Sequence, residues 1–395
     1  MDQKEDNKTQ DTLLRVIELA KAYGEKLQAK RELRLWKDIN VPCKLSDTIN
    51  RLTKAEMDSI RKNLELKNLS ALRKNELAAK LVNMVPLKYK QVIYNLDKER
   101  YDLLKSIVKN SGSVLYKDLS VSKIESLMAG SIVFPGVYNN QKVLAMPQEL
   151  INVFLETDGA ELEKTVQLNT EWIRLTHGFL YYYGVADIRL IEEKINQLTG
   201  EEMDFYKYIK VMSDAIDYYG QIRYCQYGFC DHRVFDVKEV FDEHKKRPTV
   251  EYYPFARRQL LKASEPDYIE KTPSMNKFTS FLSIYYDLTS EDKDEIALQL
   301  NNMMNMGANT QAIIDYLQSL LEFPSFEFVQ ELASQIMDVH NNTRMWILKG
   351  HTPNELFQEE MKFLRPLPDK PFMTGQTSSK VVDINTRKKI GRNDP

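Results

Sequence analysis

The sequence has few glycines and very few cysteines, 14 and 3 among its 395 residues. It contains no P-loop, no dinucleotide-binding glycine fingerprint, no nucleophile elbow and no His-Glu-x-x-His pair. Glycines spread so thinly argue against a loop that cradles phosphate groups with its backbone. These absences favour a protein that is not an enzyme, and an enzyme of unrecognised type in the helical part of the chain is the lesser alternative.

Long apolar runs are also missing. No stretch approaches the ~20 residues that a membrane helix needs, and the first residues, Met1–Lys8, are polar and mixed in charge, unlike a signal peptide. The three cysteines, Cys43, Cys225 and Cys230, are too few for a disulfide framework, which indicates a reducing compartment. We therefore expect a cytoplasmic protein without a membrane partner.

Charge is nearly balanced, with a formal net charge of −2, but it is unevenly distributed. Residues 44–110 carry 15 Lys or Arg against 8 Asp or Glu, whereas residues 150–350 carry 20 against 32. The tail from residue 376 is basic again, with a net charge of +3. An acidic body with basic segments near both ends predicts that any contact with a polyanion is local. The alternative is that the first basic segment is simply a solvated helical face.

A helix, an extended bridge and a second helix are predicted within the first basic segment. The run Thr53-Lys54-Ala55-Glu56 is a capping box, which marks the start of a helix. The bridge covers residues 65–70, and the second helix is expected from residue 73 to residue 84, ending before Pro86.

This arrangement resembles the Rho N-terminal and SAP modules, and the runs that carry the resemblance are Leu52–Met57, Leu64–Leu66 and Leu72–Leu77. Such modules often dock on nucleic acid through the helix ends and the bridge, so the resemblance implies RNA or DNA contact within residues 50–90. Phosphate contact needs only well-placed cations. The candidates are Lys67, Arg73, Lys74 and Lys80. A helical hairpin without a nucleic-acid role is the alternative.

The next segment has the element order of a winged-helix unit. Helices are expected at 97–110, from a capping box at Ser122–Glu125, and at 147–156, and two strand-like runs flank the turn Tyr138–Gln141. The helix in the recognition position, 121–129, carries one Lys and one Glu, and the wing carries one cation. A DNA reader needs more side chains directed at bases and phosphates. We interpret the unit as structural or protein-binding, with DNA reading as the alternative.

From about residue 168 the sequence is helical and rich in aromatic residues. A tandem of helix pairs predicts a bundled or solenoid-like all-α domain. Within it, residues 340–351 form a dense polar and aromatic run. One interpretation is a corner between two helices anchored by a buried Trp346. The sharper hypothesis is a partner-binding site with an exposed anchor, built on Arg344, Trp346 and His351.

Cys225, Cys230 and His232 form a cluster of metal-type ligands. Structural zinc usually takes cysteine pairs two to four residues apart, closed by a second pair, and the sequence has no second pair. The aromatic surroundings favour a buried strand or hairpin in which the cysteines are small core residues. We expect no metal or other cofactor in this chain and keep these three residues as weak candidates.

The last five residues, Gly391–Pro395, follow a basic stretch, Asn385–Ile390. Together they resemble the lead-in to a SEC-C module, the small zinc knuckle at the end of the SecA translocase motor and of many bacterial proteins. In that family a Cys-Pro-Cys-Gly-Ser-Gly run follows and supplies metal ligands, so the resemblance implies a zinc-bound knuckle in a longer native form. The family uses the knuckle to contact the ribosome or a translocation chaperone. A basic tail with a chance match is the alternative.

These observations predict a mainly α, multi-domain protein. Its expected segments are an N-terminal amphipathic helix (1–43), the Rho-N/SAP-like basic module (44–92), a small winged-helix-like α+β unit (93–160), a larger all-α helical domain (165–365) and a linker with the start of a SEC-C module (366–395). We expect a non-enzymatic, cytoplasmic adaptor of SEC-C type that binds a protein or ribonucleoprotein partner. The alternative is a nucleic-acid-binding regulator that uses the basic module together with the winged unit.

Overall fold

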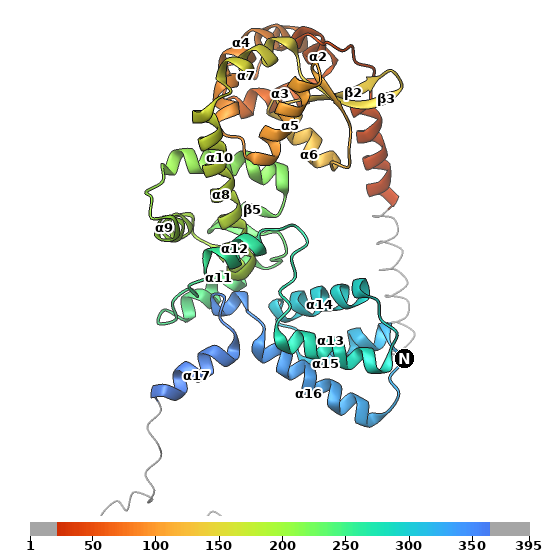
Figure 1. The fold of residues 1–395 in the computed structure, drawn as a ribbon, viewed down its shortest axis with the longest axis vertical. Coiled ribbons are helices and arrows are strands. Elements are labelled where there is room, and N and C mark those ends of the chain that lie inside the picture. The colour runs from red at the N-terminus through yellow and green to blue at the C-terminus, as the bar shows by residue number, and fades with distance from the viewer. Residues whose placement is uncertain (1–21, 364–395) are drawn as a thin grey trace, which may run out of the picture. The chain divides into compact units, whose positions relative to one another are not determined.

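The computed structural model describes residues 22–363 (Figure 1). The described part is mainly helical, as predicted, and includes two three-stranded antiparallel sheets. The described residues up to Pro353 form one compact unit, and a second unit begins at Asn354; helix α17 (Pro353–Phe363) spans the described part of the second unit. The predicted linker and SEC-C-like run, 366–395, lie outside the described residues, and the N-terminal helix is described from residue 22 to residue 35.

The first hydrophobic core runs from Leu35 to Val166 and includes Tyr218 of a later helix. Residues of the segments 44–92 and 93–160 pack into this same core. Its helices are α2 (Leu45–Arg51), α3 (Lys54–Asn63), α4 (Lys74–Tyr94), α5 (Lys98–Lys109), α6 (Val121–Ala129), α7 (Gln148–Thr157) and the first half of α8 (Ala160–Tyr183).

Two of these helices begin at the capping residues that the sequence predicts. The Thr53 hydroxyl accepts from the Glu56 backbone N–H at 3.3 Å, and the Glu56 carboxylate accepts from the Thr53 N–H at 2.6 Å. Asp97 caps α5 by accepting from the Arg100 N–H at 3.1 Å. These caps satisfy backbone groups that a helix start leaves without partners.

The start of α6 differs from the prediction. Ser120 caps this helix by accepting from the Lys123 N–H at 3.3 Å, so the predicted capping box at Ser122 is wrong. Glu125, the expected carboxylate of that box, instead accepts from Nε of Arg31 at 3.2 Å. The Glu125 carboxylate therefore binds Arg31, which is distant in sequence, and not the backbone N–H group that the local pattern predicted.

Helix α4 continues through Pro86, where the sequence predicts its end. Proline lacks an N–H and removes one helical hydrogen bond. The inner face of α4 is fully buried before the proline, at Leu81 and Val85, and after it, at Tyr89 and Ile93. Burial of apolar side chains on both sides offsets the lost bond, and the predicted stop before Pro86 is wrong.

The first sheet lies against these helices. Its strands are β1 (Ser113–Leu115), β2 (Phe134–Tyr138) and β3 (Gln141–Ala145), in the order β1-β3-β2. Asn139 and Asn140, at φ of 50° and 59°, form the two-residue turn between β2 and β3, which confirms the predicted hairpin. Strand β1 was not predicted, because three residues are too few to show an alternating pattern. The outer edge of β2 is covered at Val137 by a parallel bridge to Asp38.

The second core is mainly helical, as predicted, but it also contains a small sheet that the prediction of an all-α domain did not include. Its helices are the second half of α8, α9 (Ile188–Thr199), α10 (Phe205–Tyr219) and α12 (Arg257–Ala263). The strands β4 (Val185–Ala186), β5 (Ile222–Cys225) and β6 (Gly228–Asp231) pair in the order β4-β6-β5. The predicted strand or hairpin around Cys225 and Cys230 is confirmed. Helix α11 (Val237–Lys246) packs beside this sheet with a smaller apolar cluster.

A third core joins four helices of the region predicted to be helical. They are α13 (Pro273–Tyr285), α14 (Ser290–Asn305), α15 (Thr310–Leu320) and α16 (Phe326–Asn342). A short 3-10 turn, Trp346–Leu348, follows α16.

Candidate nucleic-acid interface

In the structure the bridge between α3 and α4 covers residues 64–73. It holds two leucines in the first core and leaves Lys67 outside. Leu64 and Leu66 are 7% and 6% exposed, and Lys67 is exposed. Glu65 and Asn68 have φ of 55° and 62°, so the chain turns sharply on either side of Leu66. Such left-handed residues reverse the side-chain direction over a short span.

All four predicted phosphate-contacting cations lie on the bridge or on α4. Lys67 is on the bridge, Arg73 precedes the helix, Lys74 is its first residue and Lys80 lies further along it. All four are exposed, and within residues 22–363 none of them forms an ion pair. The start of a long helix adds a partial positive charge, although one of its N–H groups, that of Arg73, already donates to Glu76 at 2.9 Å.

The cations of helix α6 and of the β2–β3 hairpin contact other side chains of the same chain instead. Lys123 of α6 pairs with Glu99 at 2.7 Å and lies 4.6 Å from the ring centre of Tyr218. Lys142, the cation of the hairpin, lies 4.9 Å from the ring centre of Trp36. Helix α6 itself packs against α3 and α10. The surfaces that would read DNA in a winged unit are therefore already occupied by this chain's own side chains.

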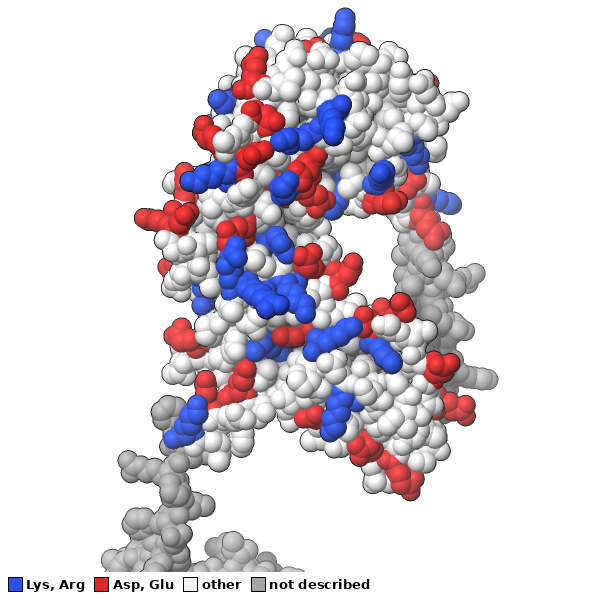
Figure 2. Space-filling model, in the orientation of Figure 1, with Lys and Arg blue, Asp and Glu red and all other residues white. Residues whose placement is uncertain are grey.

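A second group of basic side chains was not predicted. Figure 2 shows it near the middle of the face presented, at the height of α12 in Figure 1. Helix α12 carries exposed Arg257, Arg258 and Lys262. Arg257 pairs with Glu171 at 2.6 Å, and nearby Arg174 pairs with Glu265. Acidic partners thus neutralise part of this group, in contrast to the four cations of the bridge and α4.

The predicted partner site around Trp346 does not present an exposed anchor. Trp346 is 3% exposed, and its indole N–H donates to the Tyr181 carbonyl at 3.0 Å. Arg344 donates to the Gly350 carbonyl at 2.9 Å, and His351, 8% exposed, lies with Nε2 2.9 Å from the Glu251 carbonyl. The hypothesis of an exposed anchor is wrong, because Trp346 is buried. The polar groups of this run form hydrogen bonds with backbone carbonyls, two of them distant in sequence.

The weak metal candidates lie on and beside the β5–β6 hairpin. Cys230 is fully buried, and burial raises its pKa to about 12. Cys225 is half-buried, and His232 is exposed with Nδ1 2.9 Å from the Gln221 carbonyl. In the described part of the chain, no group of three or more His, Cys, Asp or Glu side chains is arranged to hold a metal ion.

Sequence analysis missed a polar pocket beside the bridge, which involves Glu65, Arg100, Lys210 and Asp214. Two of these residues lie on α10, more than 100 residues after the others in the chain. No local spacing relates residues so far apart. The one signal in the sequence was an arginine at position 100, on the inner face of an amphipathic helix.

Comparison with family models, curated proteins and solved structures returned no match for this chain. Within residues 22–363, no helix combines the length and the apolar character needed to span a bilayer.

Proposed function

We propose that this protein is a non-enzymatic adaptor that binds RNA or DNA through the bridge and α4 of residues 44–92. The observation that carries the proposal is the set of four exposed cations without ion-pair partners in the described chain, Lys67, Arg73, Lys74 and Lys80. Cations that have no internal partner are free to neutralise phosphates and release the counterions condensed on a nucleic acid, which drives binding without a base-specific site.

The resemblance of the C-terminal run to SEC-C proteins supports a ribonucleoprotein as the partner. In that family the knuckle contacts the ribosome or a translocation chaperone. A ribosomal surface offers phosphates for the cations of residues 44–92 and a docking point for a knuckle beyond Pro395. A zinc-bound knuckle remains part of this proposal for a longer native form, and elemental analysis of that form tests it.

The winged-helix-like segment has a supporting role in this proposal. Its cations Lys123 and Lys142 bind aromatic and acidic side chains of the same chain. The segment would hold α4 and the bridge in place and make no base contacts. A regulator that reads DNA with both modules is therefore the less supported alternative.

The test is a fluorescence-anisotropy titration of labelled single-stranded RNA and duplex DNA at increasing salt. With four phosphate contacts, we expect a slope of log affinity against log salt of roughly −3 for the single-stranded RNA and roughly −3.6 for the duplex DNA. Reversing all four cations to Glu should abolish binding at low salt. The control reverses four other exposed cations, Lys245, Arg258, Lys262 and Lys277, and should retain most of the affinity.

Two outcomes would overturn the proposal. The first is a quadruple variant of the bridge and α4 that binds as well as the parent. The second is a loss of binding in the control variant alone, which would assign polyanion contact to the basic group on α12. Circular dichroism and thermal melting of both variants show whether either has unfolded.

A further inference from the structure

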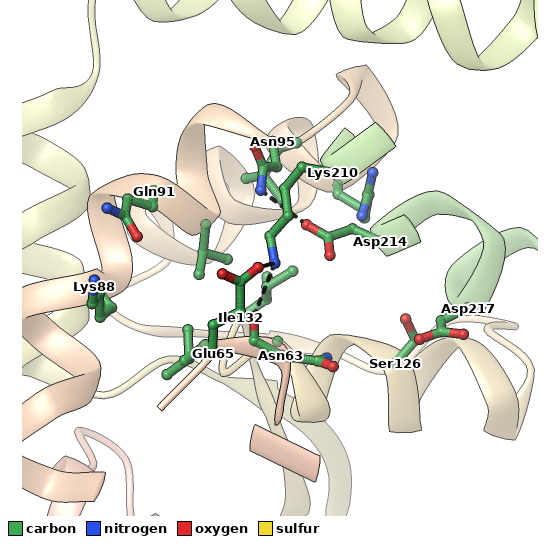
Figure 3. A pocket seen from close by; sticks show the side chains of 15 residues that line it. Asn63, Glu65, Lys88, Gln91, Asn95, Ser126, Ile132, Lys210, Asp214 and Asp217 are labelled. Atoms are coloured by element: carbon green, nitrogen blue, oxygen red, sulfur yellow. Dashed lines mark hydrogen bonds and ion pairs between the residues drawn. The ribbon is translucent and has the colours of Figure 1, made fainter. Parts of the chain in front are cut away.

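A pocket of about 350 Å³ lies between the bridge, α4, α5, α6 and α10 (Figure 3). Its volume is at the lower end of the range for small-molecule sites. Apolar side chains, including Leu64, Val92 and Ile132, form part of its wall. Ten of its fifteen lining residues are polar or charged, and they come from segments far apart in the sequence. This composition suits a polar ligand better than an apolar one.

Arg100 supplies a buried donor without a partner. The residue lines the pocket and is 2% exposed. Its Nε donates to Asp97 at 3.1 Å, whereas its Nη2 is buried and has no hydrogen-bond partner within the described residues. Leaving a buried charged donor unpaired is costly, on the order of 1–3 kcal/mol or more. Asp97 is bonded to Nε of Arg100 through Oδ1 and to the Tyr219 hydroxyl through Oδ2, the latter at 2.7 Å.

Asp214 of α10 supplies a carboxylate in the same pocket. Its Oδ2 accepts from the Asn95 amide at 3.1 Å, and Figure 3 shows these two side chains facing each other. Burial raises the pKa of Asp214, and the nearby charges of Arg100 and Lys210 oppose that rise. A ligand cation beside this carboxylate would restore the charge that burial disfavours.

The charges of the pocket cancel. It is lined by three basic residues, Lys88, Arg100 and Lys210, and by three acidic residues, Glu65, Asp214 and Asp217. One acidic and one basic residue of the lining already form an ion pair with each other. Lys210 donates to Glu65 at 2.6 Å and to the Asn63 carbonyl at 3.3 Å, which links α10 to the bridge and to the end of α3. A lining without net charge favours a ligand without net charge that carries both signs.

We propose that this pocket binds a free amino acid, whose carboxylate accepts from Nη2 of Arg100 and whose ammonium group donates to Asp214. A ligand that is only an anion would be repelled by the Asp214 carboxylate, and a ligand that is only a cation would be repelled by Arg100. A zwitterion satisfies both groups at once. The amides of Gln91 and Asn63 also line the pocket. This site is separate from the four cations of the proposed nucleic-acid interface.

Isothermal titration calorimetry of the full chain with each proteinogenic L-amino acid tests the proposal. We expect one-to-one binding of at least one of them at concentrations up to about 10 mM. The carboxylic acid without its amino group, and the amine without its carboxylate, should each bind at least about tenfold more weakly than that amino acid.

Asp214→Asn is the informative variant, because it removes the charge and keeps the shape of a half-buried side chain. We expect it to weaken binding by about tenfold or more while its melting temperature stays near that of the parent. Asp242→Asn, on the exposed face of α11, is the control and should bind as the parent does. Arg100→Lys keeps a cation beside Asp97 but has no Nη2, and it too should weaken binding.

Three outcomes would overturn the proposal: no binding by any amino acid, full affinity in Asp214→Asn, or equal affinity for the acid without its amino group. In the first case the free donor of Arg100 would be satisfied by water; in the other two, Asp214 would not bind the ammonium group. The four-cation charge reversal should leave amino-acid binding unchanged, so failure of the nucleic-acid proposal and failure of this one are distinguishable.

Discussion

The phenolic hydroxyl of Tyr219 donates to Oδ2 of Asp97 over 2.7 Å. Asp97 is also the cap of α5 and the ion-pair partner of Arg100, and both side chains of that pair are 2% exposed. Burial alone would raise the pKa of Asp97, but the charge of Arg100 and the Tyr219 hydrogen bond hold it below its usual range. One carboxylate therefore joins the first core to α10.

We expect Asp97→Ala to lower the free energy of unfolding by about 3–5 kcal/mol, because it leaves Arg100 as a buried charge without a partner. Tyr219→Phe removes one hydrogen bond to the same carboxylate and should cost about 1–3 kcal/mol. Urea unfolding of both variants measures the difference. A cost below about 1 kcal/mol for Asp97→Ala would show that Arg100 finds another partner or water.

Gly184 and Gly200 test how tightly Trp346 is packed. Both follow helices at positive φ, 69° and 72°. A Cβ on Gly184 would lie 2.6 Å from Cγ of Trp346, whereas a Cβ on Gly200 would meet nothing within 4 Å. Gly200→Ala should therefore cost about 1 kcal/mol, from backbone strain, and Gly184→Ala should cost clearly more in the same unfolding assay. Equal costs would contradict the close contact with Trp346.

Local signals predicted much of the helical structure. The capping box of Thr53 and Glu56 formed as expected because both partners lie within four residues of each other. Pro86 was read as a helix stop because the sequence does not show that the face on both sides of it is buried. Propensity is a weak prior, and tertiary packing outweighed it here.

Burial of the polar run near Trp346 could not be predicted, because its partners are distant in sequence. Lys349, for example, is 7% exposed and donates to the carbonyls of Arg247 and Val250 at 2.8 and 2.7 Å. Composition alone suggested an exposed surface. The pocket at Arg100 was missed for the same reason, since Asp214 is supplied by a helix that only the fold brings near.

Thiol labelling should distinguish the three cysteines. Cys43 and Cys230 are 3% and 0% exposed, and burial raises their pKa values to about 11 and about 12. Because the thiolate is the reactive form, only the half-buried Cys225 should react rapidly with an aromatic disulfide reagent in the native protein. Cys225→Ser should abolish the fast phase, and Cys43→Ser should leave it. A fast phase that persists in Cys225→Ser would contradict the burial of the other two.

His244 should make stability depend on pH. Its ring is 4% exposed, with Nε2 2.6 Å from the Trp346 carbonyl and Nδ1 3.1 Å from the Tyr252 hydroxyl. The ring is neutral in this arrangement: Nε2–H donates to the carbonyl, and Nδ1 accepts from the tyrosine. Burial lowers the pKa of His244 from 6.5 to about 4.

Below pH 6.5 the unfolded chain binds a proton at this histidine that the folded chain does not bind until about pH 4. The stability contribution is therefore complete above pH 6.5, declines as the pH falls to about 4, and amounts to roughly 3 kcal/mol across that window. His244→Gln keeps a donor and an acceptor but does not titrate, so its unfolding free energy should fall less steeply between these pH values. If His244→Gln keeps the parent slope, the ring is not held neutral in the folded protein.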